Sequence, residues 1–400
     1  MASSDIVYLD NAATTHKPRR VINAVKRFYE EMNANIARGL YELSVKATKL
    51  YEEAHELVAR LIGARSWAEV VFTRNSTDSA NIVAWTMVAN GIVRENDNIV
   101  VSIGEHHSNM LPWKMISELT GAELRFVPVD GRGFVDIDRL EELVDDRTKV
   151  VAVNVVSNVT GRVNDVRRVA RLAHRHGAYV VADGAQAVPH MKVDVGSLEV
   201  DFLFFSGHKM MGPTGTGVLW MREDLARELA PPIRGGGAIR SVRVEGRSLK
   251  VDYADPPWKW EPGTPHIAGA VGLSEAVRYL LEIGLDRIAG HEEELTRYLL
   301  SRLQELGEVV EGVVGGWDTE RRLGIVAFTV KGVAPHAVAL ALGLRNIAVR
   351  AGFHCAEPLH RFLGFNEGSV RVSFYLYNGP EDVDSLIEAL SSLVKRGGES

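Results

Sequence analysis

The sequence predicts an α/β fold with a mostly parallel sheet that is covered by helices on both faces. Apolar runs rich in β-branched residues alternate with segments in which apolar residues recur at helical spacing. Most of these runs lack the alternation of a half-exposed strand, and unbroken apolar runs are typical of strands buried on both faces. Strands that alternate with helices indicate a parallel sheet, whose ligand site lies beyond the carboxyl ends of the strands.

The strands that we expect lie, in chain order, at 69–73, 98–102, 124–129, 149–156, 178–183, 201–206 and 217–220. A helix should cover 79–90, because the cluster Asn75-Ser76-Thr77-Asp78 before it is typical of a helix start. A second helix should cover 166–176, where apolar residues again recur at helical spacing.

From residue 231 onward the sequence predicts a different succession of elements. Residues 231–265 are rich in Gly, Pro, Trp and charge, and we expect them to be irregular. A long amphipathic helix follows at 269–283, and strands are expected at 324–330 and 369–373. The natural division is therefore a large domain of residues 17–265 and a small domain of residues 266–400, with residues 1–16 assigned to the small domain.

Composition argues against nucleic-acid and membrane partners. Of the 400 residues, 46% are hydrophobic and 24% are charged, which suits a soluble protein with a large core. A formal net charge of −6 is unfavourable for nucleic-acid binding. We find no run of about 18 apolar residues, so we expect no membrane span. The first five residues lack the basic start and apolar stretch of a signal peptide, so we expect a cytoplasmic location.

Polar side chains stand at the ends of the predicted strands. Because the carboxyl ends of parallel strands meet at one edge of the sheet, we expect these side chains to converge there. They are Thr77, His106, Asn158, Asp183, Gln186, Ser206, His208 and Lys209.

Lys209 and Asp183 are candidates for cofactor chemistry. A lysine at the mouth of such a site can form a Schiff base if desolvation lowers its pKa, although most lysines are simply solvated at the surface. A carboxylate at the end of an apolar strand needs a cationic or hydrogen-bonding partner. The protonated nitrogen of a pyridine ring is one such partner for Asp183, and a helix cap or an ion pair is the alternative.

Thr77 and His106 each have two interpretations. Thr77 lies at a predicted helix N-terminus, which attracts phosphate, but it also suits simple capping. His106 can stack on a ring or carry a proton, whereas its neighbour His107 suits a solvated loop. No spacing of His, Cys and Asp matches a structural zinc site, so we expect no metal.

Cys355 is the only cysteine of the chain, so the fold cannot depend on an internal disulfide. Arg350 and His354 lie close by in the sequence, and positive charge near a thiol favours the reactive thiolate. Gly352 and Pro358 favour an exposed loop. A lone cysteine is more often buried and inert, but a second reactive centre elsewhere in the chain favours a nucleophile here.

A set of short motifs occurs in the order of one known family over nearly the whole chain. The motifs are Tyr8-Leu9-Asp10-Asn11-Ala12-Ala13-Thr14-Thr15, Arg74-Asn75-Ser76-Thr77, Glu105-His106-His107-Ser108-Asn109, Ser157-Asn158-Val159-Thr160-Gly161, Asp183-Gly184-Ala185-Gln186, Ser206-Gly207-His208-Lys209, Gly263-Thr264-Pro265 and the segment 350–355. The chain resembles pyridoxal-phosphate-dependent enzymes of the class V aminotransferase fold, and most closely the SufS-like cysteine desulfurases. This resemblance implies a fold-type-I large domain with a mostly parallel, mixed seven-stranded sheet and a small α+β C-terminal domain.

The resemblance also implies residue roles. Lys209 would bind pyridoxal 5′-phosphate and shuttle protons, Asp183 would pair with its ring nitrogen, and Gln186 would bind its ring hydroxyl. His106 would stack on the ring. The cofactor phosphate would be bound by Ser76, Thr77, Ser206, His208 and by Thr264 of the partner subunit, and the substrate carboxylate by Asn158, Arg371 and Arg350.

The reaction implied is the conversion of L-cysteine to L-alanine, with sulfur transferred to Cys355 as a persulfide for iron–sulfur cluster assembly. The implied partners are a second copy of the chain and a sulfur acceptor of the SufE or SufU type, or a cluster scaffold. Selenocysteine lyase, cysteine sulfinate desulfinase and aminotransferase are alternatives on the same fold, and a non-catalytic assembly scaffold is a further one. Phe353 and Ala37 depart from the family pattern, which commonly has histidine at both positions.

Overall fold

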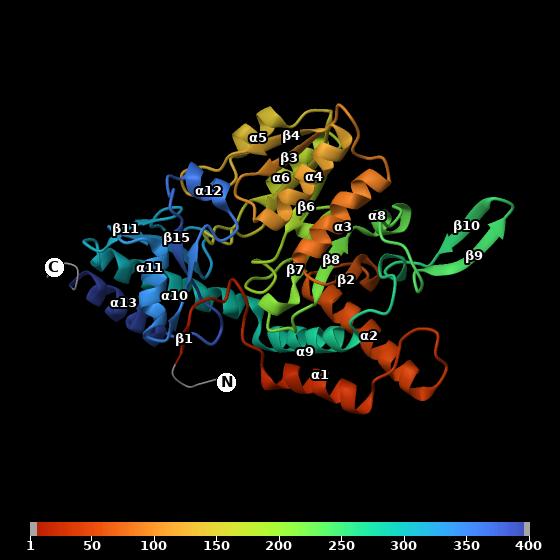
Figure 1. Cartoon of the computed structure of the whole chain (residues 1–400), viewed down its shortest axis with the longest axis horizontal. Helices are drawn as coiled ribbons and strands as arrows, with labels where there is room; N and C mark the ends of the chain where they lie inside the picture. The colour runs from red at the N-terminus through yellow and green to blue at the C-terminus, as the bar shows by residue number, and fades with distance from the viewer. Residues whose placement is uncertain (1–5, 396–400) are drawn as a thin grey trace.

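The computed structural model describes residues 6–395, and a seven-stranded sheet lies at the centre of its larger part (Figure 1). The strand order is β2 (Val70–Thr73), β8 (Gly217–Met221), β7 (Phe202–Ser206), β6 (Tyr179–Asp183), β5 (Thr148–Asn154), β3 (Asn98–Ser102) and β4 (Glu123–Val127). Strand β8 runs antiparallel to β2 and β7, and the other neighbours are parallel. The α/β fold with a mixed seven-stranded sheet is therefore confirmed, and the expected strands are present with small shifts at their ends.

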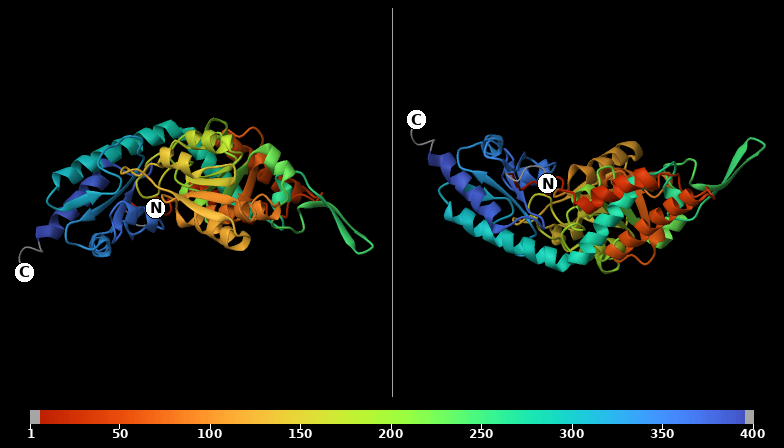
Figure 2. Two further views of the ribbon diagram at one scale, coloured as in Figure 1. Left: turned by 90° about the horizontal axis from the view of Figure 1, so that it is seen from above. Right: turned by 90° about the horizontal axis from the view of Figure 1, so that it is seen from below.

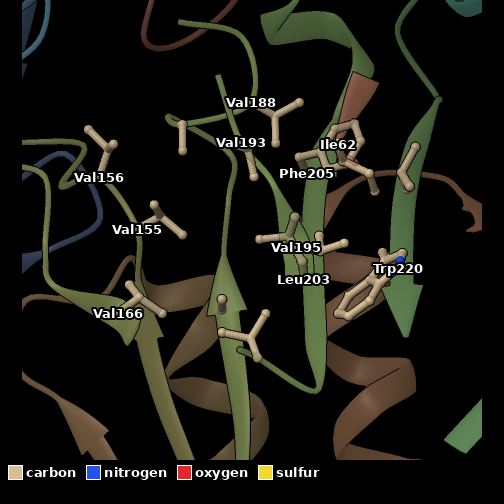
Figure 3. Packing of buried hydrophobic residues seen from close by; sticks show 14 of the residues in the cluster. Ile62, Val155, Val156, Val166, Val188, Val193, Val195, Leu203, Phe205 and Trp220 are labelled. Carbon is tan, nitrogen blue, oxygen red and sulfur yellow. The ribbon is translucent and has the colours of Figure 1, made fainter. Parts of the chain in front are cut away.

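Helices cover both faces of this sheet. One face carries α3 (Ser76–Ala89), α4 (Leu111–Thr120) and α8 (Glu223–Glu228), and the other carries α2 (Glu42–Leu61), α5 (Ile137–Leu143), α6 (Val166–Arg175), α7 (Val195–Leu198) and α9 (Ile267–Ile283). Successive residues of one strand enter different cores. In β7, Leu203 and Phe205 pack in the core that Figure 3 shows, whereas Phe202 and Phe204 pack on the α3 side. This arrangement explains why the strands read as unbroken apolar runs.

A second, antiparallel sheet with its own core forms the smaller part. Its strand order is β11 (Val310–Val313), β12 (Ile325–Val330), β15 (Ser369–Ser373) and β14 (Arg350–Gly352). The helices around it are α10 (Leu285–Glu305), α11 (Pro335–Gly343), α12 (Glu357–Phe362) and α13 (Pro380–Lys395). Strand β1 (Val7–Tyr8) pairs in parallel with β13 (Ile347–Ala348), so this first strand lies against the smaller part.

Helix α9 links the two parts. It begins directly after the boundary that the sequence suggests, yet it packs against α1 (Arg19–Glu31) and α2 in one apolar cluster of the larger part. The division of the chain into residues 17–265 and 266–400 therefore stays a proposal. Residues 1–5, on which the expectation about a signal peptide depends, and residues 396–400 lie outside the described residues.

The expectation that 231–265 is wholly irregular is wrong. A hairpin of β9 (Ile239–Glu245) and β10 (Ser248–Tyr253) projects from the larger part (Figures 1 and 2). Its turn includes Gly246 at a left-handed φ of 62°, a conformation that glycine adopts without strain. The apolar side chains Val244 and Leu249 of this hairpin are exposed. The hairpin therefore lacks the long apolar run from which the buried strands are predicted.

Candidate active site

One cavity of about 550 Å³ lies between the carboxyl ends of the large sheet and the smaller part. Every predicted site residue except Thr264 lines this cavity. The predicted residues that line it are Ser76, Thr77, His106, Asn158, Asp183, Gln186, Ser206, His208, Lys209, Arg350, Cys355 and Arg371. Thr264 is exposed and lines two other hollows, where its hydroxyl lies 3.4 Å from the Asn35 side-chain nitrogen.

Lys209 and Asp183 form the charged centre of this cavity. Lys209 ends the short helical turn Gly207–Lys209 after β7, and burial lowers the pKa of its amine to about 8 although the charge of Asp183 opposes the shift. Burial raises the pKa of Asp183, whose carboxylate accepts one backbone hydrogen bond of 2.8 Å from Ala185. This buried carboxylate has few donors, which leaves it able to accept a bond from a cationic ligand.

Hydroxyl groups gather at the N-terminus of α3. The Ser206 hydroxyl accepts a 2.9 Å hydrogen bond from the Ser76 backbone N–H, and the two serine hydroxyls lie 2.7 Å apart. Thr77 shares a 2.7 Å hydrogen bond with the Ser108 hydroxyl. The hydroxyl donors and the helix dipole favour an anion here. Burial lowers the pKa of nearby His208 to about 4, so its ring is a neutral donor rather than a cation.

His106 is also uncharged. Burial lowers its pKa to about 3, with a contribution from the charge of Lys209. Its Nδ1 accepts a 3.1 Å hydrogen bond from the Ser108 backbone N–H. A ring nitrogen that accepts carries no proton, so the neutral ring has its proton on Nε2.

Three buried polar atoms on side chains that line the cavity have no partner within the described residues, and one of them is Nδ1 of His354. Gln186 donates through Nε2 to the Ala12 carbonyl at 2.8 Å, which leaves its Oε1 free. Arg371 donates to the Asn158 carbonyl at 2.9 Å, and its Nε is free. Since buried polar groups are normally satisfied, these atoms mark places where a polar ligand fits.

Cys355 lies in a strained loop after β14. Both His354 and Cys355 adopt a left-handed backbone, with φ of 51° and 57°, which costs about 1–3 kcal/mol for each residue. Their carbonyls are held from the larger part. The Asn158 side chain donates to the His354 carbonyl at 2.7 Å, and the His107 N–H donates to the Cys355 carbonyl at 2.8 Å. The loop leaves the thiol exposed, as the sequence suggested.

The expectation that His354 adds positive charge near the thiol is wrong. Its side chain is buried, which lowers its pKa far below the ordinary value, and its Nε2 lies 3.0 Å from the Ser369 hydroxyl. The charges that interact with the Cys355 sulfur instead belong to Lys209, Arg350 and Arg371. Arg350 and Arg371 both contact Asp10, at 2.9 and 3.5 Å.

Sequence reasoning missed Asp10 and the buried polar network behind Asp183. Asp10 was visible only as part of an N-terminal motif, and its two arginine partners are far away along the chain. Glu105 is buried and accepts hydrogen bonds of 2.6 Å from Asn109 and from Asn154, which lines the cavity. Burial and the charge of Asp183 raise the pKa of Glu105 well above its ordinary value.

Comparisons with known proteins agree with this geometry. Residues 7–386 match the family described as Aminotransferase class-V. A protein named probable cysteine desulfurase from Aeropyrum pernix is 47% identical over 97% of this chain and 94% of its own length. The apo structure of a cysteine desulfurase from Thermococcus onnurineus superposes with a TM-score of 0.91 at 40% identity, covering 98% of this chain and 95% of that one.

A third relative is the cysteine desulfurase CsdA from Escherichia coli. Its structure superposes with a TM-score of 0.88 at 35% identity and covers 98% of this chain and 95% of its own. The family match spans nearly all the described residues, including both walls of the cavity. On this basis the chain belongs to the class-V aminotransferase family.

Proposed function

We propose that the protein is a pyridoxal-phosphate-dependent cysteine desulfurase of the SufS-like group, which forms L-alanine from L-cysteine and receives the sulfur on Cys355. The observation that carries the proposal is the exposed thiol of Cys355 in the same cavity as Lys209 and Asp183. An aminotransferase on this fold would not need the thiol. The names of the relatives support the same activity.

The residues of the cavity fit the cofactor. Lys209 would bind its aldehyde, and Asp183, with its raised pKa, would pair with the ring nitrogen. His106 would stack on the ring and Gln186 would bind the ring hydroxyl. The phosphate would lie against Ser76, Thr77, Ser206 and His208, completed by Thr264 of the partner subunit in a homodimer. The exposed position of Thr264 outside the cavity is compatible with that role.

The bound cofactor supplies an electron sink for the bonds of the substrate α-carbon. Arg371, which keeps its charge at neutral pH, would bind the substrate carboxylate together with Asn158, and Arg350 would assist from the entrance. Lys209 can take up and return a proton at the α-carbon, because its lowered pKa lies close to neutral pH.

Cys355 then acts as the nucleophile. A sulfur–sulfur bond forms between the Cys355 thiolate and the substrate sulfur while the carbon–sulfur bond of the substrate breaks. The electron pair of the broken bond stays with the carbon skeleton, which is protonated and leaves as alanine. Lys209, Arg350 and Arg371 surround the Cys355 sulfur with positive charge. We further propose transfer of the persulfide to a SufE- or SufU-like acceptor or a cluster scaffold, in the cytoplasm.

The proposal is tested by measuring alanine formed from L-cysteine under reductant by the wild-type protein and by Cys355→Ala. Alanine from the wild type alone supports desulfurase chemistry with Cys355 as the sulfur acceptor. Equal alanine from both proteins contradicts the role of Cys355. If neither protein forms alanine, a SufE-like acceptor is added, and the proposed activity is contradicted when alanine still does not form. L-selenocysteine and L-cysteine sulfinate then test the alternative reactions.

A further inference from the structure

The backbone carbonyl that precedes Lys209 is surrounded by donors from the N-terminal segment. The His208 carbonyl accepts from the Lys17 ammonium at 2.9 Å and from the Thr14 hydroxyl at 3.1 Å. The Thr15 backbone N–H and hydroxyl also donate to it, at 3.1 and 3.2 Å. A carbonyl oxygen has two lone pairs, so four donors around it are more than it usually accepts. Of these donors a charged ammonium forms the strongest hydrogen bond.

Lys17 has no carboxylate partner within 4.0 Å among the described residues. Its other contacts are the Thr14 hydroxyl at 3.2 Å and the Thr15 carbonyl. The ammonium is partly buried, and a buried cation without a counter-ion costs free energy unless hydrogen bonds offset the lost hydration. The three oxygen acceptors are therefore what keeps Lys17 in this place, and one of them belongs to the residue before Lys209.

The N-terminal segment, through Thr15, also contacts the chain just after Lys209. The Met211 backbone N–H donates to the Thr15 hydroxyl at 2.8 Å. Met211 adopts a left-handed backbone with a φ of 64°, which is strained for a residue other than glycine. Thr15 thus satisfies the N–H of a strained residue while Lys17 and Thr15 bind the carbonyl on the other side of Lys209.

The segment also contacts the rest of the site. From β1, which pairs with β13 in the smaller part, it passes Asp10, which contacts Arg350, and Ala12, which contacts Gln186. In Figure 1 it runs from the smaller part to α1 of the larger one. Lys17 is its last lysine or arginine before α1, and its hydrogen bond to the His208 carbonyl lies next to Lys209.

We propose that Lys17 is a positioning residue, whose ammonium acts with Thr15 to clamp the turn that carries Lys209. The inference rests on the proposed function, because its purpose is to hold the Lys209 amine where it bonds the cofactor aldehyde with loss of one water. Two variants test it in the full-length protein. Lys17→Met removes the donor and Lys17→Arg keeps the charge. Lys26→Met, which removes an exposed lysine of α1, is the control.

The first readout needs no cofactor. Hydrogen exchange is measured in cofactor-free protein over residues 207–212, where the N–H groups of Met210 and Gly212 bond to the Gly207 carbonyl. Lys17→Met should exchange there about tenfold faster, the effect of losing one charge-assisted hydrogen bond. Lys17→Arg should stay near the wild type, and Lys26→Met should match it. Unchanged exchange in Lys17→Met overturns the clamp.

The second readout uses the loaded protein. Lys17→Met should lose pyridoxal phosphate to a scavenger about tenfold faster, and the pH midpoint of its visible absorption should move, with rescue by Lys17→Arg. An unchanged rate and midpoint overturn the positioning role. If the wild type binds no cofactor, the proposed function fails and the exchange experiment alone decides about the clamp. If Lys17→Met does not fold, Thr15→Val gives the same comparison, because it removes the hydroxyl from both ends of the turn.

Discussion

The side-chain amide of Asn158 donates a hydrogen bond of 2.7 Å to the backbone carbonyl of His354, the residue before Cys355. Asn158 belongs to the loop after β5 in the larger part, whereas His354 belongs to the smaller part. This bond helps to hold two successive left-handed residues, so the cavity wall itself maintains the strained backbone at the thiol. Asn158 therefore links the proposed carboxylate site to the position of the nucleophile.

Asn158→Ala should slow persulfide formation on Cys355 in a single turnover by about tenfold or more, because one hydrogen bond is lost and the loop strain is no longer offset. The cofactor content should stay near that of the wild type. Rapid quenching with mass analysis measures the persulfide, and Asn366→Ala, on an exposed loop, is the control. A persulfide rate equal to that of the wild type would show that the bond does not position the thiol.

Arg371→Lys should raise the KM for L-cysteine by about tenfold to a hundredfold, since an ammonium cannot replace the two-pronged binding of a carboxylate by guanidinium. The visible spectrum of the bound cofactor should not change. The exposed Arg361 of α12 provides the matched variant, Arg361→Lys. Steady-state alanine formation checks the prediction, which fails if both variants keep the KM of the wild type.

Substitutions of Lys209 and of Cys355 should have different effects on cofactor binding and on sulfur transfer. Lys209→Ala should lose both the visible colour and all alanine formation, because both depend on its amine. Cys355→Ala should keep the colour and lose sulfur transfer from cysteine. Absorption spectra and alanine assays on the two purified variants provide the comparison. A colourless Cys355→Ala protein, or a coloured and active Lys209→Ala protein, would contradict the assigned roles.

The pH dependence of cofactor uptake should report the lowered pKa of Lys209. Only the neutral amine attacks an aldehyde, so uptake by cofactor-free protein should speed up with rising pH and level off above about 8. The charge of Asp183 opposes the lowering, so Asp183→Asn should move the midpoint to lower pH. Asp384→Asn, at the surface, should not move it. Stopped-flow absorbance follows the uptake. An uptake rate that still rises through pH 10, near the value of a solvated lysine, would be inconsistent with a buried amine.

The strand pattern made much of the fold and the cavity predictable. Because apolar runs end in polar residues at one edge of the sheet, positions such as Asp183 and Ser206 could be brought together from sequence alone. The charge state of His354 could not be predicted from the sequence. It depends on burial by distant segments and not on the neighbouring residues in the chain. The contacts of Asp10 with Arg350 and of Lys17 with His208 join residues far apart in the chain, and no periodicity reports them.

In the proposed reaction, Cys355 receives the sulfur of the substrate in a cavity shared with Lys209. The most direct measurement is the mass of the intact protein and of the peptide containing Cys355 after one turnover with L-cysteine. We expect a mass increase of one sulfur atom, confined to Cys355, sensitive to reductant and absent in Lys209→Ala. Alanine formed without any sulfur on Cys355, or sulfur added equally in Lys209→Ala, would contradict it.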